Sequence, residues 1–428
     1  MLSRVNALRP AKALALAVLA LAWPGGAAAQ AFDGSQPLDA FTGPVTVEGR
    51  IIGLGGAVVG VGEGLGATLL NPAAVAHRRR DLDRRWDVGG TLTWYLPIAE
   101  DLGRTDLGND GRADADLAAV QNLQLGGMLQ VGRFGLGVVA TAWRRAVRRP
   151  GDDAVAINTS DVSVVAGWSA RQDELVVGAA LTTGAGEVSW YAPGVPLSAG
   201  APTVRYEGAR FRLGLLARPR GEWWRFGLAW DPGAIAEAKG ARADFQVATP
   251  ARFRFPWTLS AGASCWVGPN ARHFNEPPVR VAVPGGWGPG PAHEAGARQP
   301  VLLTAQLDLV GPAPDAVTIE SALVPDRPVV RSGERGSLVP RIGVEWEAWR
   351  RWVRGRAGSY LEPSRSGAGP RLHGTGGFEV RIPFWPWDLQ AGAYADVASL
   401  YRNVTVSLGF WGETAPLPPV PGAPTAGT

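Results

Sequence analysis

The sequence predicts an all-β protein, a transmembrane antiparallel β-barrel of about 14 strands (range about 12–16) with an N-terminal plug inside the barrel. From residue 87 onward, segments of roughly eight to twelve residues alternate between apolar and polar side chains and end in turn residues. Charged residues recur at mid-strand on the polar face, which suits a wet barrel lumen but not the dry core of a sandwich. Trp and Tyr gather near the strand ends, as in the aromatic girdles of membrane barrels.

Residues 1–29 are predicted to be a signal peptide. Arg4, Arg9 and Lys12 precede an apolar core of eleven residues, Ala13–Trp23, and small residues around Ala29 offer a cleavage site. This core is shorter than the roughly 20 apolar residues that a membrane-spanning helix needs, and no later segment of the sequence reaches that length. We therefore expect an exported chain without helical membrane spans.

Residues 30–86 are predicted to form an N-terminal segment and plug. A glycine-rich run from residue 53 to 66 leads into Asn71-Pro72-Ala73. Glycine allows close backbone contact, and Asn-Pro stops regular structure, so this stretch suits a plug packed against a wall. Asn71 can bond neighbouring backbone groups while Pro72 stiffens the turn; the alternative is a turn that merely ends the plug. The candidate plug and gate residues are Gly53, Gly55, Gly56, Asn71, Pro72 and Ala73.

Residues 87–411 are predicted to be the barrel. The alternation places Leu213, Leu228, Leu259 and Leu307 on the lipid face. Charges of the opposite parity either mark a substrate path or form a paired network that fills and stiffens a wide barrel. The predicted lumen-facing charges are Arg212, Arg225, Asp308, Glu345, Glu379 and Arg381.

The connections between strands are predicted to alternate between short periplasmic turns and long external loops, as in bacterial barrels. Two strands are doubtful, Ala241–Thr249 and Ala316–Val324, and the Pro-rich residues 412–428 are predicted to be a disordered tail. The predicted long loops are Pro97–Val120, Arg144–Ser160, Asp231–Arg242, Gly268–Pro300 and Pro325–Pro340.

The chemistry-bearing motifs of enzymes are missing from the sequence. It has no Gly-x-Ser-x-Gly and no phosphate-binding loop, and the acidic loop Asp106–Asp116 has Leu117 where an EF-hand needs Glu, so a plain solvated loop is expected. Cys265 is the only cysteine, which excludes an intrachain disulfide. The four histidines are far apart, so we expect no metal, no cofactor and no enzymatic activity. The net charge of +4 comes mostly from arginine without a basic helix, and nucleic acid is not expected as a partner.

Three stretches resemble the FadL-type outer-membrane transport family: Gly53–Ala76, Pro250–Val267 and Arg341–Trp411. The resemblance implies a fourteen-stranded barrel, a plug near the N-terminus, and passive import of long-chain fatty acids or aromatic hydrocarbons. The chain departs from the family in two places. About twenty residues, Gln30–Gly49, precede the plug signature, and a basic cluster, Arg78–Arg80, follows it.

These features predict an outer-membrane channel of a Gram-negative bacterium for passive uptake of hydrophobic small molecules, gated by the N-terminal plug. Its expected partners are the hydrophobic ligand, outer-membrane lipid and the barrel-assembly machinery. The alternative is an outer-membrane scaffold or secretion-associated protein of the same superfamily, with long loops such as Gly268–Pro300 making the protein contacts. A continuous apolar pocket beside residues 50–76 would favour transport, and a sealed interior with a large loop platform would favour the scaffold.

Overall fold

The computed structural model describes residues 32–77, 86–96, 104–114, 117–149, 153–239, 248–268, 271–275, 280–283, 286–289, 301–323, 329–349, 352–384 and 387–411. The predicted signal peptide, Arg78–Arg80, most of Ala241–Thr249 and the predicted tail lie outside the described residues. The boundaries proposed for these regions remain predictions.

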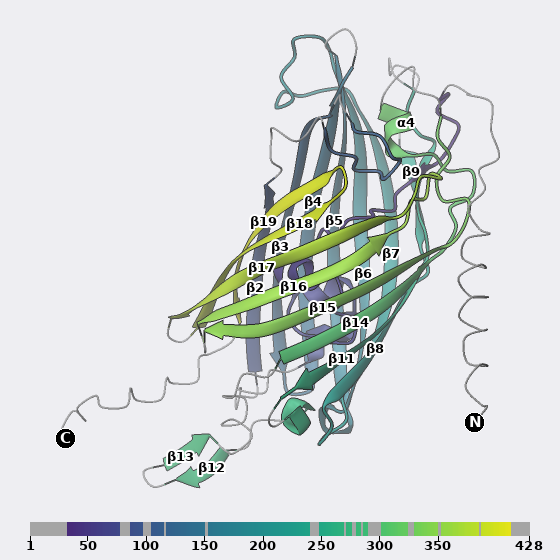
Figure 1. Cartoon of the computed structure of the whole chain (residues 1–428). Helices are drawn as coiled ribbons and strands as arrows, with labels where there is room; N and C mark the ends of the chain where they lie inside the picture. Colours follow the sequence, from purple (N-terminus) through teal and green to yellow (C-terminus); the bar gives the residue numbers. More distant parts are fainter. Residues whose placement is uncertain are drawn as a thin grey trace, which may run out of the picture.

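Within the described residues, fourteen strands form a closed antiparallel ring, in which β19 pairs with β2 (Figure 1). The predicted barrel fold is therefore confirmed. The strands are β2 (Trp86–Leu96), β3 (Leu117–Val131), β4 (Phe134–Arg148), β5 (Ala154–Ala170), β6 (Leu175–Tyr191), β7 (Thr203–Ala217), β8 (Trp224–Asp231), β11 (Thr258–Val267), β14 (Val301–Val310), β15 (Ser337–Trp349), β16 (Val353–Glu362), β17 (Arg371–Phe384), β18 (Trp387–Ala398) and β19 (Tyr401–Trp411).

The remaining elements lie inside the ring or at its two ends. They are β1 (Leu38–Asp39), α2 (Gly49–Gly53), η1 (Gly66–Leu69), η2 (Pro72–Ala76), η4 (Arg171–Asp173), β9 (Ala234–Lys239), β10 (Arg252–Phe255), η5 (Ala271–Asn275), β12 (Arg280–Val283), β13 (Gly286–Pro289) and α4 (Ile319–Leu323). We call the end with the Gly132-Arg133 connection the turn end, and the end with α4 the loop end (bottom and top of Figure 1).

The outer surface of the wall is apolar. Leu213, Leu228, Leu259 and Leu307 are between 36% and 45% exposed, in agreement with the predicted lipid face. Exposed aromatic side chains lie near both ends: Trp86, Phe134 and Trp168 at the turn end, and Trp94, Trp230 and Trp257 at the loop end. An apolar band between two aromatic girdles is the lipid-facing surface of an outer-membrane barrel, so the protein is a multi-pass protein of the Gram-negative outer membrane. None of the helices in the described part of the chain is long and apolar enough to cross a membrane.

Two predictions at the loop end are wrong. Arg144–Ser160 is not a long loop, because β4 continues to Arg148 and β5 begins at Ala154. Both strands extend there because Val147 and Val155 are buried in an apolar cluster at this end. The doubtful strand Ala316–Val324 contains the helix α4 instead. Thr318 begins this helix by accepting a hydrogen bond from the Ser321 N–H at 3.3 Å, as an N-cap residue does.

The prediction that Gly268–Pro300 is a long external loop is also wrong. It follows β11, which ends at the turn end, and it carries η5 and the hairpin β12–β13 (Figure 1, bottom). Since short turns mark the periplasmic side of bacterial barrels, the described parts of this connection lie on the periplasmic side. The sequence analysis placed this connection outside because of its length, since long connections in bacterial barrels are usually external.

The wall bends near the loop end of β8 and β11. The two strands pair up to Asp231 and Thr258 and continue beyond the bend as the pair β9–β10. Pro232 and Pro256 occupy the bend, where their missing N–H groups interrupt the ladder. Beyond the bend, β10 pairs in parallel with β1 from the N-terminal segment.

The segment that follows β1 runs down the inside of the barrel. We call residues 42–77 the inner segment (purple in Figure 1). Its helix α2 packs against β16–β19, and η2 packs against β3–β7 on the other side of the ring. Irregular backbone at membrane depth is possible only where protein surrounds it, and the wall provides those surroundings.

Candidate functional site

The wall has glycine where the inner segment approaches most closely. A Cβ atom on Gly178 would lie 2.4 Å from the Pro72 carbonyl oxygen, and one on Gly227 would lie 1.9 Å from that of Val59. Neither distance is possible for a real side chain, so these contacts require glycine. Such residues form a belt across paired strands, which we call the glycine belt: Gly135, Gly167, Gly178, Gly214, Gly227, Gly262, Gly343 and Gly358.

Polar side chains of the wall bond the backbone of the inner segment. Gln306 Oε1 accepts hydrogen bonds from the N–H groups of Val58 and Val59 at 3.0 and 2.9 Å. On the neighbouring strand, the Ser264 hydroxyl donates to the Gly60 carbonyl at 2.8 Å. Across the ring, Gln130 Nε2 donates to the Val75 carbonyl at 2.7 Å. These bonds satisfy backbone groups that have no helix or sheet partner, so the inner segment is held in one conformation.

Asn71 is the most highly connected of the predicted plug residues. Its side chain is fully buried, and its Nδ2 donates to the carbonyls of Val59 at 2.9 Å and of Leu215 in the wall at 3.1 Å. Its Oδ1 accepts from the Ala73 N–H at 3.1 Å, which starts η2 with Pro72 as the first residue. Asn71 therefore joins two parts of the inner segment to β7. Its role as a gate remains a prediction.

The predicted glycines lie in and after α2. Gly55 and Gly56 have φ values of +63° and +80°, so they end the helix in a left-handed turn. Gly53 has ordinary φ and faces the Tyr394 ring, which a Cβ atom would approach to 2.9 Å. Ala73 is buried against β6, where the Gly178 position leaves room for it. All six predicted residues thus contact the wall or turn the chain beside it.

Five of the six predicted lumen charges form ion pairs, and three of these five belong to one network. Glu345 pairs with Arg50 of α2 at 2.9 Å and with Arg356 of β16 at 2.6 Å. Arg356 also pairs with Glu379 at 3.1 Å, and Arg50 pairs with Glu63 at 3.1 Å. The chain of charges therefore joins wall strands to both ends of the glycine-rich run.

Arg225 extends this network to the turn end. Its guanidinium is fully buried and pairs with Glu63 at 2.6 Å. It also donates to the Val61 carbonyl at 3.0 Å and stacks on the Phe274 ring of η5 at 3.8 Å. The other predicted charges lie outside this network. Asp308 pairs with Arg341 at 2.7 Å, and Arg212 pairs with Asp231 at 2.9 Å. Arg381 lies near the turn end of β17, where its backbone N–H donates to the Trp352 carbonyl.

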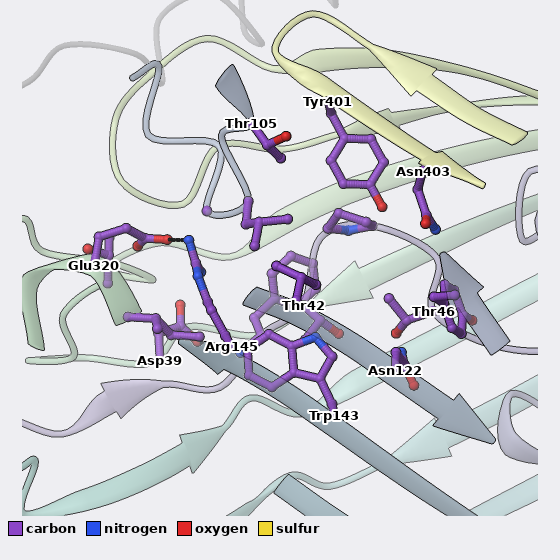
Figure 2. A pocket seen from close by; sticks show the side chains of 18 of the residues that line it. Asp39, Thr42, Thr46, Thr105, Asn122, Trp143, Arg145, Glu320, Tyr401 and Asn403 are labelled. Carbon is purple, nitrogen blue, oxygen red and sulfur yellow. Dashed lines mark hydrogen bonds and ion pairs between the residues drawn. The ribbon is translucent and has the colours of Figure 1, made fainter. Parts of the chain in front are cut away.

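A cavity of about 100 Å³ lies at the loop end, between the start of the inner segment and the rim of the barrel (Figure 2). A buried water needs roughly 10–15 Å³ of such space, so this cavity has room for a small ligand. Aromatic and apolar side chains provide much of its lining: Phe41, Pro44, Tyr95, Leu107, Val120, Trp143, Ile319 and Tyr401. It lies beside residues 39–46 and not beside residues 50–76, where the sequence analysis placed the expected pocket.

Three charged side chains that line this cavity, Asp39, Arg145 and Glu320, form ion pairs. Figure 2 shows Arg145 against Glu320, at 2.5 Å, and Arg145 also pairs with Asp114 at 2.7 Å. Asp39 accepts from Arg365 at 2.8 Å and from the Ser332 hydroxyl at 2.7 Å. The cavity thus presents aromatic surface and hydrogen-bonding groups between balanced ion pairs.

The acidic loop at Asp106–Asp116 contributes Leu107 and Gly108 to the lining of this cavity. The prediction of a plain solvated loop is therefore wrong. Asp106 and Asp114 are both buried, and the Asp106 carboxylate accepts from the N–H groups of Asp110 and Gly111 at 3.1 and 2.9 Å. Burial raises the pKa of Asp106 to about 6. It also raises the pKa of Asp114, although Arg145 acts in the opposite direction. In the described part of the chain, no three or more His, Cys, Asp or Glu side chains are grouped so that they would hold a metal ion.

Neither the glycine belt nor the cavity was predicted from the sequence. The sequence does contain a signal for the belt, because its glycines occupy strand positions whose side chains would point into the barrel, as at Gly178 and Gly214. The sequence contains no such signal for the cavity, since residues as far apart in the chain as Asp39, Trp143 and Tyr401 line it.

No protein-family model matches the sequence, and no curated protein matches it. Solved structures do match. A FadL homologue of Pseudomonas aeruginosa superposes with a TM-score of 0.50 at 13% identity, covering 87% of this chain and 100% of that one. The toluene transporter TodX of P. putida covers 87% of this chain and 99% of its own, with a TM-score of 0.48 at 11% identity. The match to the FadL homologue shows that the chain has the fold of a FadL-type outer-membrane transport protein, as the sequence resemblance predicted.

Proposed function

We propose that the protein is a passive outer-membrane channel for hydrophobic small molecules, which bind first in the cavity at the loop end. The observation that carries this proposal is the position of the cavity. It lies on the external side, is lined by rings such as Trp143 and Tyr401, and has the inner segment as its floor. An apolar pocket with a few placed polar groups is the usual form of a small-molecule site.

The inner segment would then be the barrier that the ligand must pass. Below the cavity, the glycine belt holds it by backbone contacts, as at Gly227 and Val59. Passage therefore requires a movement of the inner segment or of the wall beside it. Long-chain fatty acids and aromatic hydrocarbons are the proposed cargo, and diffusion down a gradient needs no energy source. Contact with outer-membrane lipid and insertion by the barrel-assembly machinery belong to the same proposal.

The alternative role as a scaffold or secretion partner relied on long external loops, of which Gly268–Pro300 was the leading example. That connection lies at the turn end, so it does not offer a platform at the cell surface. The proposal of a channel is preferred for this reason.

The test is uptake of toluene and of oleate by cells that lack their own transporters for these compounds. Thr46 lines the cavity, and Thr46→Trp should fill it. We expect uptake of at least one of the two compounds with the wild-type protein, and an at least tenfold lower rate with Thr46→Trp. Leu125→Trp, on the exposed outer wall, is the matched control and should keep the wild-type rate. Equal uptake by the Thr46→Trp and Leu125→Trp variants would show that the ligand does not pass through the cavity.

A further inference from the structure

The cavity at the loop end contains an amide side chain that the protein leaves unbonded. Asn122 of β3 lines the cavity and is only 6% exposed, and its side chain has no hydrogen-bond partner among the described residues. Figure 2 shows it on the right of the view, with Thr46 and Asn403, while Arg145 and Glu320 lie on the left. A buried amide without a partner is unfavourable, so this position indicates that water or a ligand group bonds to Asn122.

Uncharged groups without partners continue from Asn122 along the inside of the wall. Gln124 is the next inward residue of β3 and is fully buried, and neither polar atom of its amide has a partner in the described part of the chain. On the neighbouring strand β2, the Thr91 hydroxyl also lacks a partner there. Native proteins leave few buried polar atoms unpaired. Three such side chains on two paired strands therefore mark a place where bound molecules supply the missing hydrogen bonds.

The interior of the cavity offers no free positive charge to a ligand. The carboxyl groups of Asp114 and Glu320 share the one guanidinium of Arg145. Glu320 is 3% exposed, and its Oε2 atom has no hydrogen-bond partner among the described residues. Arg402, the other cation of the described lining, is exposed and already makes another interaction. A carboxylate ligand would lose its hydration here and find Arg145 already bound to two carboxyl groups, so its binding is unfavourable.

The size and the apolar part of the cavity suit a single ring. The volume of about 100 Å³ is of the order that holds one aromatic ring and is too small for a long alkyl chain. Phe41 and Trp143 provide apolar surface for such a ring. A hydroxyl group on the ring both donates and accepts hydrogen bonds, and the Asn122 amide does the same. The hydroxyl would therefore supply the partner that Asn122 lacks.

We propose that the cavity binds an uncharged aromatic compound with a hydroxyl group, such as a phenol, and that Asn122 recognises this hydroxyl. The inference rests on the proposed function, because it names the chemical class that binds in the same cavity. A buried site that bonds a hydroxyl discriminates against an analogue without one, because its own polar groups are then left unpaired. Toluene and benzoate are the informative analogues, since a methyl group or a carboxylate replaces the hydroxyl on the same ring.

The experiment measures binding of phenol, toluene and benzoate to the purified protein in nanodiscs, by equilibrium dialysis at neutral pH. Binding in the cavity is the part that Thr46→Trp removes, which separates it from partition into lipid. Asn122→Leu keeps the size of the side chain and removes its hydrogen-bonding groups. Asn158→Leu is the matched control, because Asn158 lies on β5, outside the cavity, and its side chain also has no partner among the described residues.

We expect phenol to bind in the wild-type cavity at least tenfold more tightly than benzoate. Asn122→Leu should weaken phenol binding at least tenfold and leave toluene binding at least as tight as half the wild-type affinity, which also shows that the variant is folded. Asn158→Leu should bind all three compounds as the wild type does.

The possible failures are distinguishable. If toluene binds in the cavity but phenol binding does not respond to Asn122→Leu, or if benzoate binds as tightly as phenol, this inference is overturned and the channel function stands. An equal loss of phenol and toluene binding in Asn122→Leu, or an equal loss of phenol binding in Asn158→Leu, overturns it as well, because Asn122 would then not read the hydroxyl. If Thr46→Trp removes no binding of any of the three compounds, the cavity is not a ligand site, and the proposed function fails together with this inference.

Discussion

Arg225 Nη1 lies 2.6 Å from Glu63 Oε1, which connects β8 of the wall to the inner segment. The same guanidinium donates to Asn275 Oδ1 at 2.8 Å and to the Phe274 carbonyl at 3.1 Å, so it also holds η5 at the turn end. Three segments far apart in sequence meet at one side chain. The residue was predicted only as a lumen-facing charge, and its position explains why the turn end and the inner segment should respond together.

Arg225→Ala should loosen both segments. Glu63 keeps its bond to Arg50, so the cost is that of the lost hydrogen bonds, about 1–3 kcal/mol, and not that of an unpaired buried charge. Hydrogen exchange of residues 57–66 should become faster while the barrel strands stay protected. Arg212→Ala is the matched control, because its partner Asp231 belongs to the wall. Equal exchange in the two variants would contradict this role of Arg225.

The glycine belt predicts a strong position dependence for Gly→Ala substitutions. Gly227→Ala would place a Cβ atom 1.9 Å from the Val59 carbonyl oxygen, so the inner segment must shift. We expect increased leakage of small solutes, with heat-modifiable migration on gels retained because the strand ladder is intact. Gly127→Ala, whose nearest contact is 3.8 Å away, should behave as wild type. A silent Gly227→Ala would show that the belt does not seat the inner segment.

Asn71 should be sensitive to loss of its donor group. Asn71→Asp keeps the acceptor for Ala73 but loses the bonds to the Val59 and Leu215 carbonyls, and it adds a buried charge. Asn71→Ala with Pro72→Ala loses the cap as well. Each variant should destabilise the bound conformation of the inner segment by about 1–3 kcal/mol or more. Faster protease cleavage within residues 57–76 would report this release. Wild-type resistance in both would reduce Asn71 to an ordinary turn residue.

The loop at residues 104–114 should become less stable as pH rises. The pKa of Asp106 is about 6 in the folded loop, above its ordinary value of 3.8. Between these values the folded loop binds more protons than the unfolded one, so its stabilisation is present at low pH and is lost as pH rises through about 6. Exchange protection of this loop, corrected for intrinsic rates, should fall between about pH 4 and about pH 6. Asp106→Asn should flatten that dependence, and an unchanged profile would exclude Asp106 as its source.

The barrel was predictable because period-2 alternation over long segments is a local signal, and the leucines of one parity proved to be exposed. The bend was not predicted, although Pro232 and Pro256 interrupt the strand pattern where it occurs. Gly268–Pro300 was placed outside because of its length, and length alone does not decide on which side of a barrel a connection lies. The cavity depends on contacts between residues such as Asp39 and Ser332, which no local pattern records.

The most direct test of the channel is to locate a hydrophobic compound on the protein. Cells are incubated with an alkyl or aryl diazirine, irradiated, and the labelled residues are mapped by mass spectrometry. The outward wall, for example Leu125 and Leu136, will be labelled from the membrane in any barrel. The proposed function predicts additional labelling of the cavity around Phe41, Thr46 and Trp143, which excess toluene or oleate competes away and Thr46→Trp abolishes. Labelling confined to the outward wall, with none in the cavity, would contradict it.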